Sequence, residues 1–355
     1  MKILLLTLSD NADHQDAVYS MFRVLRTSYA VKAILVKNPK VNIENDVDIK
    51  TINAQKRPGL TIQAFNILQL IKMIFFIWRG HFDFIYIESL HIWNLFIWII
   101  HPSITKVIQV IHDVDPHPGD SSVKMVELMN QLTCKYVDAI ILRSKVSINR
   151  FKEKYKTTKP IEAIDLWRSS VDYTPMIHTR RALFFGRINK YKGIEYLKKI
   201  TEICNNVQFD IVGRVEDNTK EIVNGLSKLP NVHLCCEYIS EKRKVEFFKQ
   251  ADFFILPYKS ATQSGVVIDA NRYSRPVIAF NVGGIKDQVL SGYNGYLVES
   301  DNVEEFSKVI DKTASLSITD LDRLSVSSYD YFKSRFSVDV AAKQLIVFLN
   351  FLKKK

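Results

Sequence analysis

Two cations and two glycine turns in the second half of this 355-residue chain have the residue types and spacing that bind phosphate groups. Arg187 and Lys192 follow an apolar run at 182–185, and two cations so close together repel each other unless an anion lies between them. Residues 260–270 and 283–287 each resemble a strand end, a turn containing Ser or Gly, and the start of a helix. Together these segments predict a diphosphate site at one edge of a parallel sheet.

The predicted helix start at Ser264, Gly265 and Val266 is a second source of positive charge at this edge. The first backbone N–H groups of a helix lack partners and lie at the positive end of the helix dipole, so they can hold a diphosphate. Gly265 also allows close approach because it has no Cβ. We expect Ser264, Gly265 and Val266 to contact the ligand.

Apolar runs that alternate with amphipathic segments indicate which elements position these turns. In the first half, strands are expected at 2–7, 31–36, 82–87, 105–111 and 139–142, and helices at 16–27, 62–79, 92–100, 123–133 and 145–155. In the second half, strands are expected at 182–185, 209–212, 232–235, 253–256, 276–279 and 295–297, and helices at 193–204, 220–228, 241–250, 265–273 and 303–313. This pattern predicts an α/β protein with two Rossmann-like, doubly wound domains, at 1–165 and 180–335, and a linker between them.

The order of these motifs resembles that of the retaining glycosyltransferases of family 4, of the glycosyl transferases group 1. The resemblance is strong over roughly 180–300 and weak before about 105. Gly186-Arg187 with Lys192-Gly193 is similar to the family segment whose Arg and Lys neutralise the donor diphosphate. Asp269 matches the second of two family acids spaced eight residues apart. Ala261 stands at the position of the first.

The resemblance implies a GT-B fold, in which two Rossmann-like domains face a cleft and a C-terminal helix, here 336–355, packs back on the N-terminal domain. It implies sugar transfer from a nucleotide-diphosphate sugar to a glycan or lipid-linked acceptor in cell-surface polysaccharide biosynthesis, with retention of configuration. A hexosyltransferase is the expected type. The donor is expected in the C-terminal domain and the acceptor in the N-terminal domain.

The resemblance also assigns site residues. It implies catalytic roles beside the sugar for Asp269 and for His112, which ends the strand at 105–111. Because position 261 is alanine and not an acid, Gln263 or Ser264 is expected to provide the polar contact there. Glu237 and Tyr238 lie where relatives contact the nucleotide base, and the sequence leaves UDP and GDP as alternatives. Arg187, Lys192 and the helix start would stabilise the leaving group, so no cofactor or metal is expected.

Composition restricts the partners. Residues 151–200 contribute +7 of the net charge of +11, yet no RNA- or DNA-binding motif accompanies them, so nucleic acid is not expected as a partner. The four cysteines lack metal spacing and suit reduced, cytoplasmic thiols. The apolar stretches at 65–78 and 92–100 are too short to span a bilayer. We expect a cytoplasmic protein that binds peripherally to an anionic inner membrane surface.

Two other functions stay open from the sequence. One is a nucleotide-sugar epimerase or phosphorylase on the same fold. The other is a non-catalytic subunit that binds a sugar nucleotide or a lipid and whose catalytic acid has eroded, as the alanine at position 261 allows. Analysis of the products separates the first from a transferase, and slow hydrolysis of the donor would exclude the second.

Overall fold

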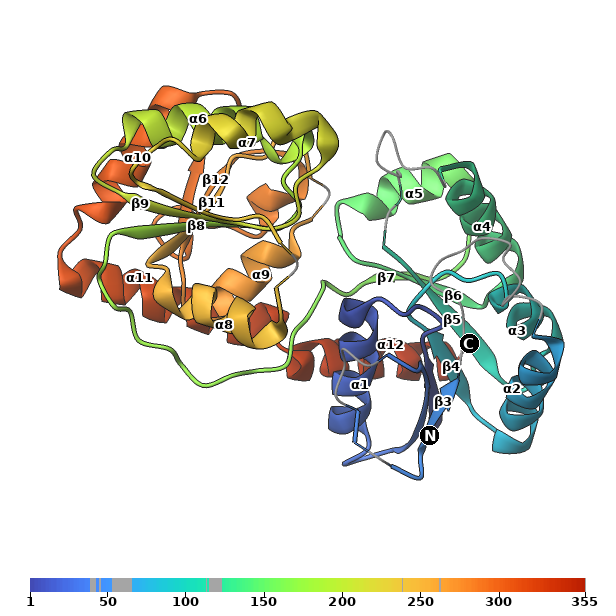
Figure 1. Ribbon diagram of the computed structural model, residues 1–355. Helices are drawn as coiled ribbons and strands as arrows, with labels where there is room; N and C mark the ends of the chain where they lie inside the picture. The colour runs from blue at the N-terminus through green and yellow to red at the C-terminus, as the bar shows by residue number, and fades with distance from the viewer. Residues whose placement is uncertain are drawn as a thin grey trace. The chain divides into compact units, whose positions relative to one another are not determined.

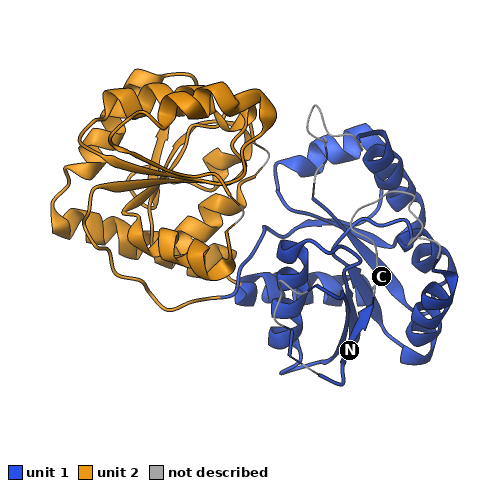
Figure 2. Ribbon diagram, viewed as in Figure 1, with its two compact units in different colours: residues 1–169, 338–355 blue, residues 170–337 orange. Residues whose placement is uncertain are grey.

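The computed structural model describes residues 1–38, 43–44, 46–52, 66–112, 114, 123–237, 239–261 and 263–354. These form two compact units, which Figure 2 shows in different colours. Unit 1 comprises Met1–Ser169 and Val338–Lys355, and unit 2 comprises Ser170–Ser337. The division after Ser169 falls within the stretch 165–179 that the sequence marks as a linker.

Unit 1 contains a parallel sheet with the strand order β3-β2-β1-β4-β5-β6-β7. Its strands are β1 (Lys2–Leu6), β2 (Ala30–Val36), β3 (Ile49–Ile52), β4 (Phe84–Ile87), β5 (Lys106–Ile111), β6 (Ala139–Leu142) and β7 (Ile161–Ala163). Its helices are α1 (Ala12–Leu25), α2 (Ile67–Gly80), α3 (Asn94–Ile100), α4 (Val123–Tyr136), α5 (Ser147–Tyr155) and α12 (Val338–Lys354). Helices α1 and α12 cover one face of the sheet and α2 to α5 the other (Figure 1).

Unit 2 contains a second parallel sheet, with the strand order β10-β9-β8-β11-β12-β13. Its strands are β8 (Arg181–Phe185), β9 (Gln208–Val212), β10 (Val232–Cys235), β11 (Phe253–Leu256), β12 (Val277–Phe280) and β13 (Gly295–Val298). Its helices are α6 (Ile194–Ile203), α7 (Lys220–Leu226), α8 (Glu241–Gln250), α9 (Gly265–Arg272), α10 (Val303–Ala314) and α11 (Ile318–Tyr331). Helices α6, α7 and α10 lie on one face and α8, α9 and α11 on the other (Figure 1).

Burial on both faces explains the sequence of the central strands. Every residue of β4, β11 and β12 is buried, so these strands are continuous apolar runs without alternation. Strand order reverses direction between β1 and β4 in unit 1 and between β8 and β11 in unit 2. Open α/β sheets bind ligands at the carboxyl ends of their strands where the order reverses. Each unit therefore has one edge position at which a site is expected.

The predicted α/β architecture is confirmed, with local differences. Strands β3 and β7 were not predicted because these short edge strands carry charged residues and little apolar signal. Helix α11 was not predicted because serine and aspartate interrupt its apolar spacing. Helix α1 begins at Ala12, earlier than predicted, because the side chain of Asn11 accepts a hydrogen bond from the Asp13 N–H and caps the helix. Part of the helix predicted at 62–79 lies outside the described residues.

Candidate functional site

The loops that follow β8, β11 and β12 in unit 2 are in backbone contact. Gly193, with φ +74°, lies so close to Pro257 that a Cβ there would overlap the Pro257 carbonyl oxygen. Gly283, with φ +48°, meets the carbonyl oxygen of Ala261 in the same way, and the Gly284 N–H donates to that oxygen at 3.0 Å. Only glycine combines these positive φ angles with so close an approach. The three predicted segments therefore do meet at one sheet edge.

Lys192 is the central cation of this edge. Its Nζ lies 5.0 Å from the ring centroid of Tyr258 and so close to Gly186 that a Cβ at that position would overlap it. No carboxylate pairs with it among the described residues. Burial lowers the pKa of Lys192 from its ordinary 10.5 to about 8, and the positive charge of Arg187 acts in the same direction, against an opposing effect of Tyr191. A desolvated ammonium without a counter-ion is unfavourable, and an anion bound beside it would relieve that cost.

Arg187 is exposed and loosely held. Its Nη1 lies 3.9 Å from Oε1 of Glu216 and its Nη2 donates to the hydroxyl of Tyr191 at 3.3 Å. Exposed ion pairs of this length contribute little to the stability of the fold. The next turn is rigid by contrast, because Asn189 is buried and its Oδ1 accepts from the Lys192 N–H at 3.2 Å. Lys192 is thus held in place, while Arg187 is free to turn toward a ligand.

The start of α9 is held by a residue that the sequence did not reveal as part of the site. The buried side chain of Gln288 accepts from the Ser264 N–H at 2.8 Å and donates to the Ser264 carbonyl at 3.3 Å. Ser264 makes no side-chain capping bond, so Gly265 and Val266 begin the helix without one. The Oε1 of Gln263 is buried and has no hydrogen-bond partner among the described residues. A buried side-chain oxygen normally accepts a hydrogen bond when its partner is present.

The remaining predicted residues of unit 2 lie apart from this turn. Asp269 is 6% exposed, one turn into α9, and its negative charge adds to the effect of burial in raising the pKa of Tyr273. Glu237 follows β10 at the edge of the sheet, two strands from β8, and forms an ion pair with Arg243. Tyr238 lies outside the described residues. Roles for Asp269, Glu237 and Tyr238 stay predictions.

A buried charged cluster lies at the carboxyl ends of β4 and β6 in unit 1. Glu88 and Arg143 follow these strands directly and form a buried ion pair, with the Tyr86 hydroxyl donating to the Glu88 carboxylate. Arg143 also stacks over Trp167, 4.3 Å from the ring centroid. Burial opposes ionisation of Glu88. The charge of Arg143 and a hydrogen bond from His112 outweigh burial and hold the pKa of Glu88 below its ordinary value.

His112 is joined to this cluster. Its Nε2 lies 2.9 Å from the carbonyl oxygen of Glu88 and 3.1 Å from Glu88 Oε1. Both partners accept hydrogen bonds, so Nε2 is the donor in these contacts. The His14 ring stacks on His112 with centroids 4.5 Å apart. Burial, with a smaller effect of His112, lowers the pKa of His14 to about 3, so His14 is neutral at physiological pH.

The comparisons with known proteins agree with the geometry of unit 2. Residues 179–315 match the family model described as "Glycosyl transferases group 1", which covers the loops after β8, β11 and β12. The similarity to this family lies in unit 2. The resemblance expected from the sequence is therefore confirmed for the family and for its GT-B fold.

Individual relatives of this chain are distant. An uncharacterized glycosyltransferase of Haemophilus influenzae is 26% identical over 54% of this chain and 57% of its own length. The Staphylococcus aureus capsular polysaccharide biosynthesis glycosyltransferase CapM is 29% identical over 36% of this chain and 35% of its own. The chain thus spans little more than half of the first relative and about a third of the second.

Solved structures match over a greater length. Anabaena Alr3699/HepE in complex with UDP covers 99% of this chain and 100% of its own, with a TM-score of 0.72 and 15% identity. The same Anabaena protein in complex with UDP-glucose matches with a TM-score of 0.70 and 16% identity. At this level of identity, the likeness supports the fold alone.

The sequence does not reveal four side chains of these two sites: Glu88, Arg143, His14 and Gln288. A signal for two of them was present, because Glu88 and Arg143 come directly after the apolar strand runs and so must lie at the same sheet edge. The contacts of His14 and Gln288 depend on loop geometry and left no such signal. Among the described residues, no group of His, Cys, Asp and Glu side chains could hold a metal ion.

Proposed function

We propose that this protein is a glycosyltransferase that moves a sugar from a nucleoside-diphosphate sugar to a glycan or lipid-linked acceptor, with retention of configuration. The observation that carries the proposal is the Lys192 ammonium, desolvated against Gly186 and without an acidic partner among the described residues. It lies where the strand order of unit 2 reverses, which is the position that favours nucleotides in such sheets.

The donor half of the proposal places the diphosphate between two kinds of positive charge. Lys192 and Arg187 come from the loop after β8, and the first N–H groups of α9 follow the loop after β11. Both loops are joined through Gly193 and Pro257. Charge that develops on the departing diphosphate is stabilised by groups already in place, which is the most effective form of electrostatic catalysis. UDP is the proposed nucleotide, because HepE is described with UDP and UDP-glucose.

The acceptor half of the proposal rests on the cluster in unit 1. Glu88 is fixed by Arg143, and Glu88 in turn fixes the ring orientation and proton position of His112. His112 is the proposed catalytic residue of this unit and Glu88 a positioning residue. In unit 2, Asp269 is the proposed contact of the transferred sugar. Gln263 is the proposed polar contact that replaces the acid absent at Ala261, because its buried Oε1 has no hydrogen-bond partner among the described residues.

A role in cell-surface polysaccharide biosynthesis is part of the proposal, supported by the similarity to CapM over about a third of each chain. The acceptor is then a growing glycan or a lipid-linked sugar, and the place of reaction is the inner face of the membrane. A hexose is the proposed sugar.

Incubation with UDP-glucose tests the proposal directly. Water is a poor acceptor, so we expect slow release of UDP together with glucose whose first detectable anomer is α, because UDP-glucose is α-linked and retention preserves that linkage. Proton NMR observes both products before the anomers equilibrate. A first β anomer would contradict retention.

Two other outcomes identify the alternatives. Isomerised UDP-sugar without UDP release indicates an epimerase. UDP binding without any turnover, in the presence of a lipid extract as acceptor, indicates a binding subunit. Thermal unfolding with UDP and with GDP provides the binding measurement, since a ligand at 100 times its dissociation constant stabilises by about 2.7 kcal/mol.

A further inference from the structure

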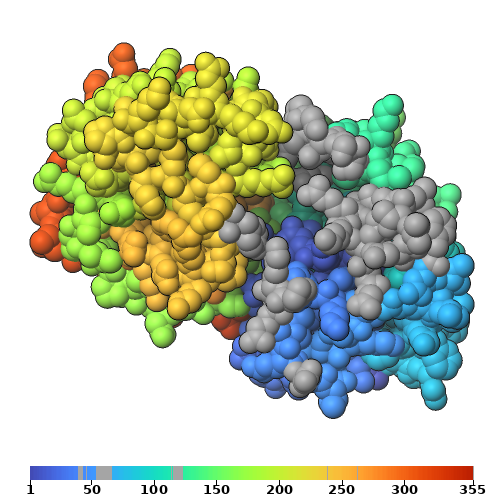
Figure 3. Space-filling model, in the orientation of Figure 1, coloured from blue at the N-terminus to red at the C-terminus, as the bar shows by residue number. Residues whose placement is uncertain are grey.

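Helix α2 carries two apolar stripes, only one of which is covered. Leu70, Met73 and Ile77 are buried against the sheet. A second stripe, formed by Leu68, Ile71, Phe75 and Trp78 at spacings of three, four and three residues, is between 49% and 73% exposed. Figure 3 shows the α2 segment, in light blue, at the molecular surface. A surface helix that is apolar on both sides has a solvent face that favours an apolar partner.

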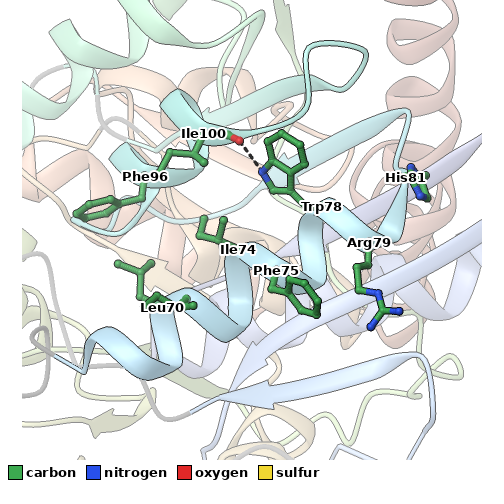
Figure 4. Close-up of a pocket in the computed structure, with 9 residues that line it drawn as sticks. Leu70, Ile74, Phe75, Trp78, Arg79, His81, Phe96 and Ile100 are labelled. Atoms are coloured by element: carbon green, nitrogen blue, oxygen red, sulfur yellow. Dashed lines mark hydrogen bonds between the residues drawn. The ribbon is translucent and has the colours of Figure 1, made fainter.

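Helix α3 lies beside the exposed stripe of α2, and residues of both helices line a groove. Phe96 and Ile100 of α3 face Ile74 and Trp78 of α2 across a cavity of about 540 Å³ (Figure 4). The indole N–H of Trp78 donates to the Ile100 carbonyl at 2.7 Å and joins the two helices. Because that donor is already satisfied, the Trp78 ring can enter an apolar medium without leaving a polar group unpaired.

The charged residues on the two helices of this groove have one sign. Lys72 and Arg79 of α2 are exposed and have no ion-pair partner among the described residues, and Arg79 stacks over Phe75, 5.2 Å from the ring centroid. Neither α2 nor α3 contains an acidic residue. At the edge of α2, Lys50 lies over Phe76, 4.8 Å from the ring centroid. An apolar face with a rim of cations complements an anionic lipid surface.

We propose that α2 and α3 form a membrane-docking surface whose apolar stripe enters the interface of an anionic bilayer while Lys72 and Arg79 contact lipid phosphates. Long cationic side chains reach the headgroups while their stems stay in the apolar layer. Within the described ranges, no helix has the length and hydropathy to span a bilayer, so the helices would lie in the interface plane. The surface would bring unit 1, where the acceptor is proposed to bind, to a lipid-linked acceptor. In that respect alone it rests on the proposed function.

A second copy of the chain fits this surface less well. A two-fold interface places the same patch on both copies, so Lys72 and Arg79 of one copy would face those of the other. Neither helix supplies an acid to pair with them. Like charges placed together at an interface act against association. The observations therefore favour lipid over self-association.

Sedimentation with vesicles of phosphatidylglycerol and phosphatidylcholine in equal parts tests the proposal, with phosphatidylcholine vesicles for comparison. The double variant Ile71→Gln/Phe75→Gln replaces exposed side chains and is expected to weaken partition to the mixed vesicles at least about tenfold, because two large apolar groups no longer enter the interface. The matched control Ile318→Gln/Val347→Gln removes two apolar side chains elsewhere that are somewhat more exposed than Ile71 and Phe75, and it is expected to bind normally.

Charge reversal tests the rim separately. Lys72→Glu/Arg79→Glu is expected to abolish the preference for phosphatidylglycerol. Lys312→Glu/Lys343→Glu changes the net charge equally at exposed positions on α10 and α12 and is expected to keep that preference. Equal loss in both charge variants would overturn the proposed surface, since binding would then follow net charge alone.

Tryptophan fluorescence locates the contact. Trp93, Trp98 and Trp167 are buried, and Trp78 is 49% exposed, so an emission shift to shorter wavelength on adding vesicles would come from Trp78. Trp78→Phe is expected to bind vesicles and lose the shift. The proposal is overturned if wild-type protein does not sediment with mixed vesicles at low salt, if the shift persists in Trp78→Phe, or if light scattering shows a dimer that Ile71→Gln/Phe75→Gln dissociates. Binding of UDP without vesicles is measured in parallel and tests the proposed function independently.

Discussion

Replacing Lys192 by methionine is expected to remove a pH dependence of UDP binding that the wild-type protein shows above pH 8. In the free protein, burial lowers the pKa of Lys192 to about 8. A diphosphate beside the ammonium raises that pKa, so binding takes up a proton wherever the free side chain is neutral. The added affinity is fully present below pH 8 and is lost as pH rises through the higher pKa of the complex.

The size of the change in UDP affinity follows from the ordinary pKa of Lys192, 10.5, and its lowered pKa of about 8. Lowering the pKa from 10.5 to about 8 disfavours the charged form by roughly 3 kcal/mol. If the diphosphate restores the ordinary value, UDP affinity falls about 20-fold between about pH 7.5 and about pH 9.5. The terminal phosphate of UDP contributes little to this change, because its second ionisation has a pKa of about 6. Proton uptake near pH 8.5 is then roughly 0.7 per UDP bound.

Calorimetric titration with UDP measures both quantities, since the binding enthalpy in buffers of different ionisation enthalpy reports proton uptake. Lys192→Met keeps the apolar stem and is expected to bind weakly with no proton uptake. Arg187→Met is the matched control, because arginine stays charged throughout this range. It is expected to weaken binding and keep the pH dependence. The assignment of Lys192 to the diphosphate would be refuted if the wild-type affinity for UDP stayed constant from about pH 7.5 to about pH 9.5. It would also be refuted if the UDP affinity of Lys192→Met fell with pH as steeply as that of the wild-type protein.

Two further predictions separate chemistry from folding. His112→Ala and Asp269→Ala are each expected to lower the rate of sugar release from UDP-glucose by about 100-fold while UDP affinity stays the same, since groups that act in the transition state affect the rate constant. Wild-type rates in both variants would place the reaction elsewhere. Arg143→Met leaves Glu88 buried without its arginine and is expected to lower the free energy of unfolding by about 3–5 kcal/mol in urea titrations. The double variant Arg143→Met/Glu88→Gln is expected to regain most of the lost stability. No recovery in the double variant would show that the decrease does not come from the stranded charge.

The sequence alone was sufficient for the elements and turns of the sheet edge at Lys192. Strands β8, β11 and β12 are short apolar runs, each followed by a glycine or serine turn, and these are local features of neighbouring residues. The spacing of Gly186, Arg187 and Lys192 therefore predicts a phosphate site without knowledge of tertiary contacts. The family resemblance depended on the same local order. The apolar spacing of α12, including Leu345 and Leu349, is likewise a local feature of the sequence.

The tertiary structure alone decided which distant residues meet. Glu88 and Arg143 are 55 positions apart in the sequence. They form an ion pair because β4 and β6 are parallel strands with only β5 between them, so both strands end at the same edge of the sheet. Gln288 reaches Ser264 only because Gly283 allows the loop after β12 to touch the loop after β11. The desolvation of Lys192 depends on its position beside Tyr258 and Gly186, and the exposure of the second α2 stripe depends on what packs against it. Burial is a property of the packed chain and not of a segment, so periodicity can show that a stripe is apolar but not whether it is covered.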